Sequence, residues 1–174
     1  MLHLYIGDGK GKTTAALGCA LRALGWGKRV YCAQFLKDTL FPCGELQAAK
    51  KYKLKLTIER FENQVHPIFL KKENINIGKI KASINNGLKK IKSLIRGKRF
   101  DIIILDEILD ALNAGFLSAK VLTDIIKKAK GTELILTGRT APSSIMRLAD
   151  YISFIGKIKH PFDRKIYPRK SIEY

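Results

Sequence analysis

A glycine- and lysine-rich stretch near the N-terminus contains the first residues whose types and spacing could do chemistry, Gly7-Asp8-Gly9-Lys10-Gly11-Lys12-Thr13-Thr14. It matches the end of the phosphate-binding pattern G-x-x-x-x-G-K-[ST], although Ile6 stands where the pattern has its first glycine. Glycines let the backbone turn tightly and direct N–H groups at an anion, a lysine bridges phosphate oxygens, and a hydroxyl ligates Mg²⁺. We therefore predict that a nucleotide is bound through Gly7, Asp8, Gly9, Lys10, Gly11, Lys12, Thr13 and Thr14. The alternative is a glycine-rich turn with solvated lysines.

Two acidic residues, Asp106 and Glu107, follow an apolar run at 100–105 that is typical of a buried parallel strand. Ligand sites in parallel sheets lie at the carboxyl ends of the strands, so these acids should emerge beside the phosphate-binding stretch. Carboxylates and a hydroxyl suit Mg²⁺, or Mn²⁺ in its place, and we predict a metal site of Thr13, Asp106 and Glu107. Arg139, in the segment LTGRTAP after another strand, is predicted to reach a phosphate; the alternative is a surface arginine in a tight turn.

The elements that must position these residues alternate along the chain between strands and helices. Hydrophobic patterns predict strands at 2–6, 29–35, 54–61, 100–105, 133–137 and 151–155. Helices are predicted at 13–24, 45–52, 77–95, 117–129 and 142–149, and a loop at 62–76. This alternation indicates an α/β fold with a mainly parallel central sheet and helices on both faces, similar to the P-loop NTPases of the RecA-like type. We expect one domain over 1–174, in which 158–174 form a basic C-terminal tail.

The composition indicates what the chain can bind and where it works. Lys and Arg number 33 against 15 Asp and Glu, and the net charge of +18 attracts anions such as nucleic acid, anionic lipid or phosphorylated small molecules. We expect the lysine-rich helix at 78–99 to present a solvated face rather than a binding patch. Cys19, Cys32 and Cys43 show no C-x-x-C spacing and are expected to be reduced thiols of a cytoplasmic protein. The sequence has no signal peptide and no apolar run of about 20 residues, so no membrane association is expected.

Several motifs together resemble one enzyme family. They are GDGKGKTTAALGCALRALGWGKRV, AQFLK, GE at Gly44-Glu45, ILDEILDALNAGFL, LTGRTAP, LAD and KHPFD. In this order and with similar spacing they are similar to the P-loop type of ATP:corrinoid adenosyltransferase, the cob(I)yrinic acid a,c-diamide adenosyltransferases, over nearly the whole chain. That family carries G-[DN]-G-K-G-K-T-T without the usual first glycine, so the resemblance accounts for Ile6.

The resemblance implies a specific reaction. The 5′-deoxyadenosyl group of ATP is transferred to the Co(I) of a corrinoid, and triphosphate is released, in adenosylcobalamin biosynthesis or salvage. No general base is needed because Co(I) carries no proton. The resemblance implies catalytic roles for Lys12 and Glu107. It implies corrinoid contacts for four residues, Lys37, Glu45, Phe69 and His160.

The sequence also departs from the family pattern in two places. The family usually has a segment before the first strand that helps to cover the corrinoid, whereas here the strand starts at residue 2. Many members have several aromatic residues in the loop before the long helix, which help to displace the lower ligand of cobalt, whereas Phe69 is the only aromatic residue within 65–69. We therefore expect a comparatively open corrinoid pocket and a preference for corrinoids without a lower base. For His160 a structural turn is the alternative to a ligand role.

The sequence also bears on the partners of the protein and on two alternative functions. The chain has no flavin or iron–sulfur motif to reduce cobalt, so we expect an external electron donor, a reduced flavoprotein, and the resemblance implies a homodimer. Two other functions stay open: a basic P-loop ATPase that binds nucleic acid, and a small-molecule kinase. The basic residues do not interleave with aromatic residues as a base-stacking platform would, so no specific nucleic acid is expected. A kinase would lack the KHPFD and LTGRTAP segments in this arrangement.

Overall fold

A computed structural model describes residues 1–37, 43–61 and 76–173. Its centre is a six-stranded sheet in the order β3-β2-β4-β5-β1-β6, and every pair of neighbouring strands is parallel. The strands are β1 Leu2–Ile6, β2 Val30–Phe35, β3 Leu56–Phe61, β4 Ile102–Asp106, β5 Glu133–Gly138 and β6 Tyr151–Phe154. This confirms the predicted α/β fold of the P-loop NTPase type.

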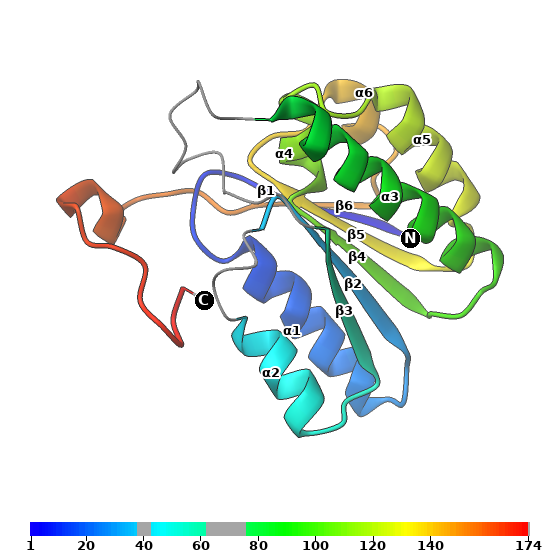
Figure 1. Ribbon diagram of the computed structural model, residues 1–174, viewed down its shortest axis with the longest axis horizontal. Coiled ribbons are helices and arrows are strands. Elements are labelled where there is room, and N and C mark those ends of the chain that lie inside the picture. The colour runs from blue at the N-terminus through cyan, green and yellow to red at the C-terminus, as the bar shows by residue number, and fades with distance from the viewer. Residues whose placement is uncertain (38–42, 62–75, 174) are drawn as a thin grey trace.

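Helices cover both faces of the sheet (Figure 1). Helices α1 and α2 lie on one face, and α3, α4, α5 and α6 lie on the other. Their bounds are α1 Lys12–Gly25, α2 Gly44–Lys51, α3 Ile77–Arg96, α4 Ile108–Asn113, α5 Ala119–Lys128 and α6 Ser143–Met146, and a 3₁₀ helix, η2, spans Pro161–Arg164. Among the described residues no helix is long and apolar enough to cross a membrane.

The central strands are apolar because both of their faces are covered. All residues of β2 are buried: Tyr31 and Phe35 belong to the cluster under α3, while Cys32 belongs to the cluster under α1. Helix α3 contributes Ile84 and Ile91, both fully buried. The lysines of α3 lie on its exposed side, as the amphipathic pattern predicted.

The structure corrects several details of the sequence prediction. Helix α4 was not predicted, because it is only 6 residues long and its apolar residues, all buried, do not form a clear amphipathic period. Helix α6 is shorter than the predicted 142–149. The predicted loop at 62–76 lies outside the described residues except for Asn76, whose side chain caps α3. The cysteines are free thiols, as predicted.

Candidate functional site

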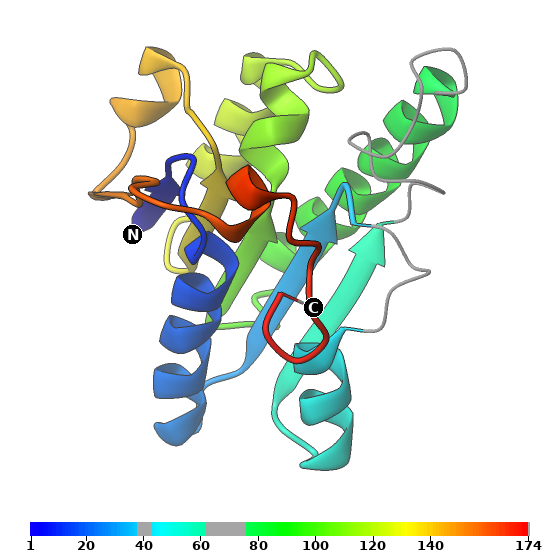
Figure 2. The same ribbon diagram turned by 90° about the vertical axis from the view of Figure 1, so that its left-hand side faces the viewer.

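The predicted site residues meet at the carboxyl ends of the strands. The phosphate loop, residues 7–11 between β1 and α1, follows β1. Glu107 follows β4, and Arg139 follows β5. Because the strands are parallel, these three segments emerge at the same edge of the sheet. Figure 2 shows this edge, with the C-terminal tail passing in front of the sheet beside the phosphate loop.

The glycines of the phosphate loop allow close packing against the end of β6. The N–H of Gly7 donates to the Arg139 carbonyl and that of Gly9 to the Ile155 carbonyl, each at 2.8 Å. A Cβ on Gly7 would overlap the Ile155 carbonyl, and one on Gly9 would lie 2.6 Å from the Gly156 oxygen. The two N–H groups are thus bonded to carbonyls and are not directed at an anion, which differs from the expectation for these glycines.

Positive charge is concentrated where the loop becomes α1. The Nζ of Lys12 donates to the carbonyls of Gly7 and Gly9 at 2.7 and 2.8 Å. Partial burial lowers the pKa of Lys12, against the nearby charge of Asp110. The first-turn N–H groups of α1 have no acceptor within the helix, and no acidic residue lies in that turn. The start of α1 can therefore bind the phosphates of a nucleotide.

The buried carboxylate of Asp106 connects the loop to two strands. The Thr13 hydroxyl donates to its two oxygens at 2.9 and 3.2 Å, and the Thr137 hydroxyl donates to Oδ1 at 2.7 Å. The Thr137 oxygen in turn accepts the N–H of Glu107 at 2.8 Å. Sequence reasoning missed Thr137, although a hydroxyl at the carboxyl end of an otherwise apolar strand was a visible signal.

Glu107 begins α4 in a left-handed backbone conformation, with φ 60°. A left-handed conformation is unfavourable for a residue other than glycine, and such residues are often found at functional sites. Glu107 directly follows Asp106, so the strained residue lies at the candidate site. Burial raises the pKa of Glu107 to about 7, while the charge of Lys37 opposes the rise. A further hydrogen bond connects α4 to the residue after β5: Asp110 accepts the N–H of Arg139 at 2.9 Å.

Lys37 lies against the predicted metal ligands. Its Nζ is 2.5 Å from Glu107 Oε1 and 3.7 Å from Asp106 Oδ2. Burial alone would lower the pKa of Lys37, but the charges of Asp106 and Glu107 outweigh it and raise that pKa. The resemblance had implied a corrinoid contact for Lys37, and the structure brings it to the acids.

Two of the other predicted corrinoid residues, Glu45 and His160, lie among the described residues. Glu45 accepts from the amide of Gln34 at 2.8 Å, and the carbonyl oxygen of that buried amide accepts from Arg60 at 3.1 Å. His160 lies in the tail, where its Nδ1 accepts the N–H of Phe162 and caps η2. Phe69 lies outside the described residues.

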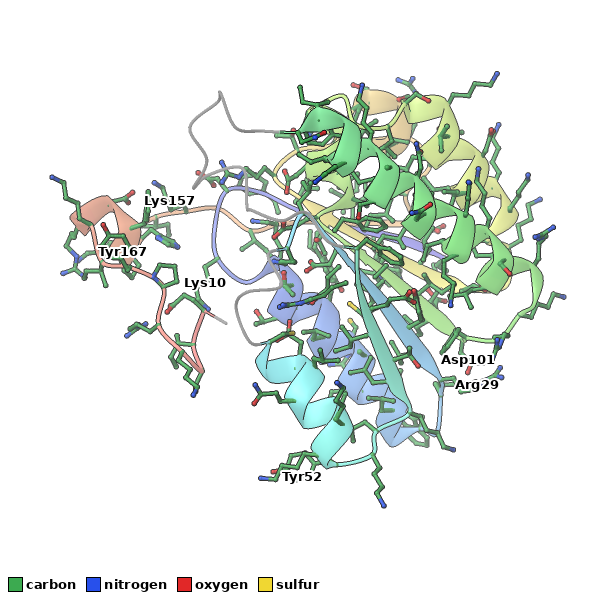
Figure 3. The ribbon with its side chains drawn as sticks, viewed as in Figure 1. Lys10, Arg29, Tyr52, Asp101, Lys157 and Tyr167 are labelled. Atoms are coloured by element: carbon green, nitrogen blue, oxygen red, sulfur yellow. The ribbon has the colours of Figure 1, made fainter. Side chains whose placement is uncertain are left out.

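The chain that follows β6 and leads into the C-terminal tail makes two further hydrogen bonds to the phosphate loop. The N–H of Lys157 donates to Asp8 Oδ1 at 3.0 Å, and the Nζ of Lys10 donates to the Ile172 carbonyl at 3.2 Å. Figure 3 shows Lys10 and Lys157 on this side, while the Arg29–Asp101 ion pair lies at the other end of the sheet. The tail therefore borders the nucleotide site.

A phosphate loop at the start of a helix, joined by a hydroxyl to a buried acid, defines a P-loop nucleotide-binding protein of the α/β class. Residues 1–174 match the family model described as ATP:corrinoid adenosyltransferase BtuR/CobO/CobP. The chain belongs to the ATP:corrinoid adenosyltransferase family.

Curated relatives carry the same description. The chain is 29% identical to the corrinoid adenosyltransferase of Escherichia coli (strain K12) and 30% identical to corrinoid adenosyltransferase CobA of Salmonella typhimurium. Each match covers 100% of this chain and 85% of the relative. The corrinoid adenosyltransferase of Pseudomonas aeruginosa is 27% identical over 100% of this chain and 83% of its own length. The predicted family and enzyme class, a transferase for ATP and a corrinoid, are confirmed, and the nucleic-acid ATPase gains no support.

Proposed function

We propose that this chain transfers the 5′-deoxyadenosyl group of ATP to the Co(I) of a corrinoid and releases triphosphate, in adenosylcobalamin biosynthesis or salvage. One observation carries the proposal: the Thr13 hydroxyl bonds to the buried carboxylate of Asp106 directly beside Lys12. This arrangement provides phosphate-binding cations and oxygen ligands at one edge of the sheet, within a chain whose full length matches the adenosyltransferase family.

The chemistry needs charge stabilisation and no proton transfer from the nucleophile. The electron pair of Co(I) attacks C5′ of the ribose, and the bond from C5′ to the α-phosphate oxygen breaks. Negative charge develops on that oxygen, so cations and N–H groups around the triphosphate stabilise the transition state more than the ground state. We assign this stabilisation to Lys12, the first turn of α1 and Arg139.

The oxygen-rich donor set suits a divalent metal ion. We assign Mg²⁺, or Mn²⁺ in its place, to Thr13, Asp106 and Glu107, a hydroxyl and two carboxylates. Within the described residues no group of three or more His, Cys, Asp or Glu could hold a metal ion by itself. Mg²⁺ is usually held by one or two carboxylates together with substrate phosphates, and the set present here is of that kind. The ion would supply positive charge to the leaving triphosphate.

The remaining assignments rest on the family resemblance. We propose that the corrinoid binds at the same edge of the sheet as Glu45, and we keep Phe69 and His160 as corrinoid contacts that the resemblance implies. We also propose that a reduced flavoprotein supplies the electron that reduces Co(II) to Co(I). We further propose a homodimer with one domain per chain and a cytoplasmic location. Free thiols at all three cysteines agree with a reducing compartment.

The identity of the phosphate product tests the proposed function. The protein is incubated with ATP, Mg²⁺ and chemically reduced cob(I)inamide, and the phosphate products are separated by ion-exchange chromatography. We expect triphosphate and adenosylated corrinoid in equal amounts, and formation of both at a rate at least about 100-fold lower with Lys12→Ala. Formation of ADP and phosphate without adenosylated corrinoid would exclude the proposal and favour a kinase or an ATPase.

A further inference from the structure

Two of the acids at the site already have a cation between them. We propose that Lys37 is a built-in competitor for the divalent metal ion at Asp106 and Glu107, so that the metal ion binds weakly until nucleotide draws the Lys37 ammonium away. The inference rests on the proposed metal role of these acids. Lys37 would then control the order in which metal ion and nucleotide bind, whereas the resemblance had implied a contact with the corrinoid.

The geometry places Lys37 where a competing cation must be. Its Nζ lies 2.5 Å from Glu107 Oε1 and 3.7 Å from Asp106 Oδ2. The Asp106 side chain is fully buried and that of Glu107 is 21% exposed, so bulk water does not reach the Asp106 carboxylate and stabilises the Glu107 carboxylate only in part. The ammonium of Lys37 provides that stabilisation.

The lysine that directly follows the phosphate loop, Lys12, is hydrogen-bonded elsewhere. Lys12 donates to the carbonyls of Gly7 and Gly9. The remaining partners of Asp106 are neutral hydroxyls, from Thr13 and Thr137. Among the residues that the structure describes, Lys37 is therefore the cation in ion-pair contact with these two carboxylates.

A divalent ion on the same oxygens would stand close to this ammonium. Like charges a few ångströms apart in a partly buried site repel strongly, so the two cations cannot both keep their best positions. The Lys37 side chain is 26% exposed and has free rotatable bonds, which allow it to turn away. A bound triphosphate offers the displaced ammonium a new counter-charge, and metal ion and nucleotide should therefore bind with positive coupling.

The test measures Mn²⁺ binding to the full chain without nucleotide, by the electron paramagnetic resonance signal of free Mn²⁺. The buffer is held at about pH 8, which is above the raised pKa of about 7 of Glu107. Lys37→Met removes the charge and keeps the length, and we expect it to bind Mn²⁺ at least about tenfold more tightly than wild type. Lys37→Arg keeps the charge and should bind as wild type does.

The matched control is Lys90→Met, which removes the same charge from α3, where Lys90 forms an exposed ion pair with Glu59 of β3. It should leave Mn²⁺ affinity unchanged, which separates a local effect from the fall in net charge. The double variant Lys37→Met with Asp106→Asn should bind Mn²⁺ less tightly than Lys37→Met alone. This loss of affinity would show that the ion binds at the carboxylates.

Equal or weaker Mn²⁺ affinity in folded Lys37→Met would overturn the inference, and so would a gain of the same size in Lys90→Met. Circular dichroism establishes folding, and Lys37→Gln replaces Lys37→Met in the comparison if that variant does not fold. Triphosphate release by the wild-type protein is measured separately. A wild type that releases triphosphate while Lys37→Met shows no gain would reject this inference alone, whereas the absence of triphosphate would reject the proposed function.

Discussion

The Thr13 hydroxyl donates to the Asp106 carboxylate at 2.9 Å, although the two residues are 93 positions apart in the chain. Strand β5 lies between β1, which leads into the phosphate loop, and β4, which carries Asp106. The contact therefore spans one strand of the sheet. It joins the start of α1 to the acid that we assign to the metal ion.

The first prediction concerns this junction. Lys12→Ala and Thr13→Ala should each lower the rate of adenosyl transfer at least about 100-fold, because they remove a phosphate-binding cation and a metal-binding hydroxyl. Thr13→Ser keeps the hydroxyl and should retain most of the activity. The measurement is the initial rate of adenosylated corrinoid formation, with folding checked by circular dichroism. Wild-type rates in both alanine variants would remove the phosphate loop from the mechanism.

The second prediction concerns Thr137. Thr137→Val preserves shape but removes the donor to Asp106 and the acceptor for the N–H of Glu107. Buried polar groups without partners are costly, so the free energy of unfolding should fall by about 2 kcal/mol in urea titration. Thr137→Ser keeps the hydroxyl and should lower the free energy of unfolding clearly less than Thr137→Val does. A valine variant as stable as wild type would show that these hydrogen bonds contribute little to stability.

The third prediction is a pH dependence that arises from Glu107. Burial raises its pKa in the folded protein to about 7 from an ordinary value of 4.5. Between these values the folded protein binds a proton that the unfolded chain has released, so the contribution of Glu107 to stability falls as pH rises through that window. The free energy of unfolding of the wild type, relative to Glu107→Gln, should therefore decrease from about pH 4.5 to about pH 7. A constant difference across that range would contradict the raised pKa.

The fourth prediction concerns the corrinoid. Phe69 is the only aromatic residue within 65–69, so displacement of a lower cobalt ligand should be inefficient. Cobinamide, which has no lower base, should be adenosylated faster than complete cobalamin when a flavoprotein reduces Co(II). Chemically prepared Co(I) should narrow the difference, because displacement is then no longer required of the protein. Equal rates under flavoprotein reduction would contradict the prediction.

The sequence by itself determined the strands and the longer helices, and the kinds of residue at the ends of these elements. The period of apolar residues marks a strand or a helix locally, and it located β1, α1 and α3 to within a residue or two. The glycine-lysine stretch and the acids after β4 are also local signals. Parallel strands place their carboxyl ends at one edge, so the prediction that these segments meet followed without knowledge of the order of the strands.

Only the tertiary structure decided which side chains share a hydrogen bond or an ion pair. The sequence gives no distance between Lys37 and Glu107, because their separation depends on how far β2 and β4 extend before the chain turns. Thr137 acts on Asp106 because β5 pairs directly with β4, and strand order is set by packing of whole elements. The N–H groups of Gly7 and Gly9 were assigned to an anion from their pattern, yet the close approach of Ile155 engages Gly9, and the Arg139 carbonyl engages Gly7. Contacts between distant segments arise from three-dimensional packing, which a local pattern does not encode.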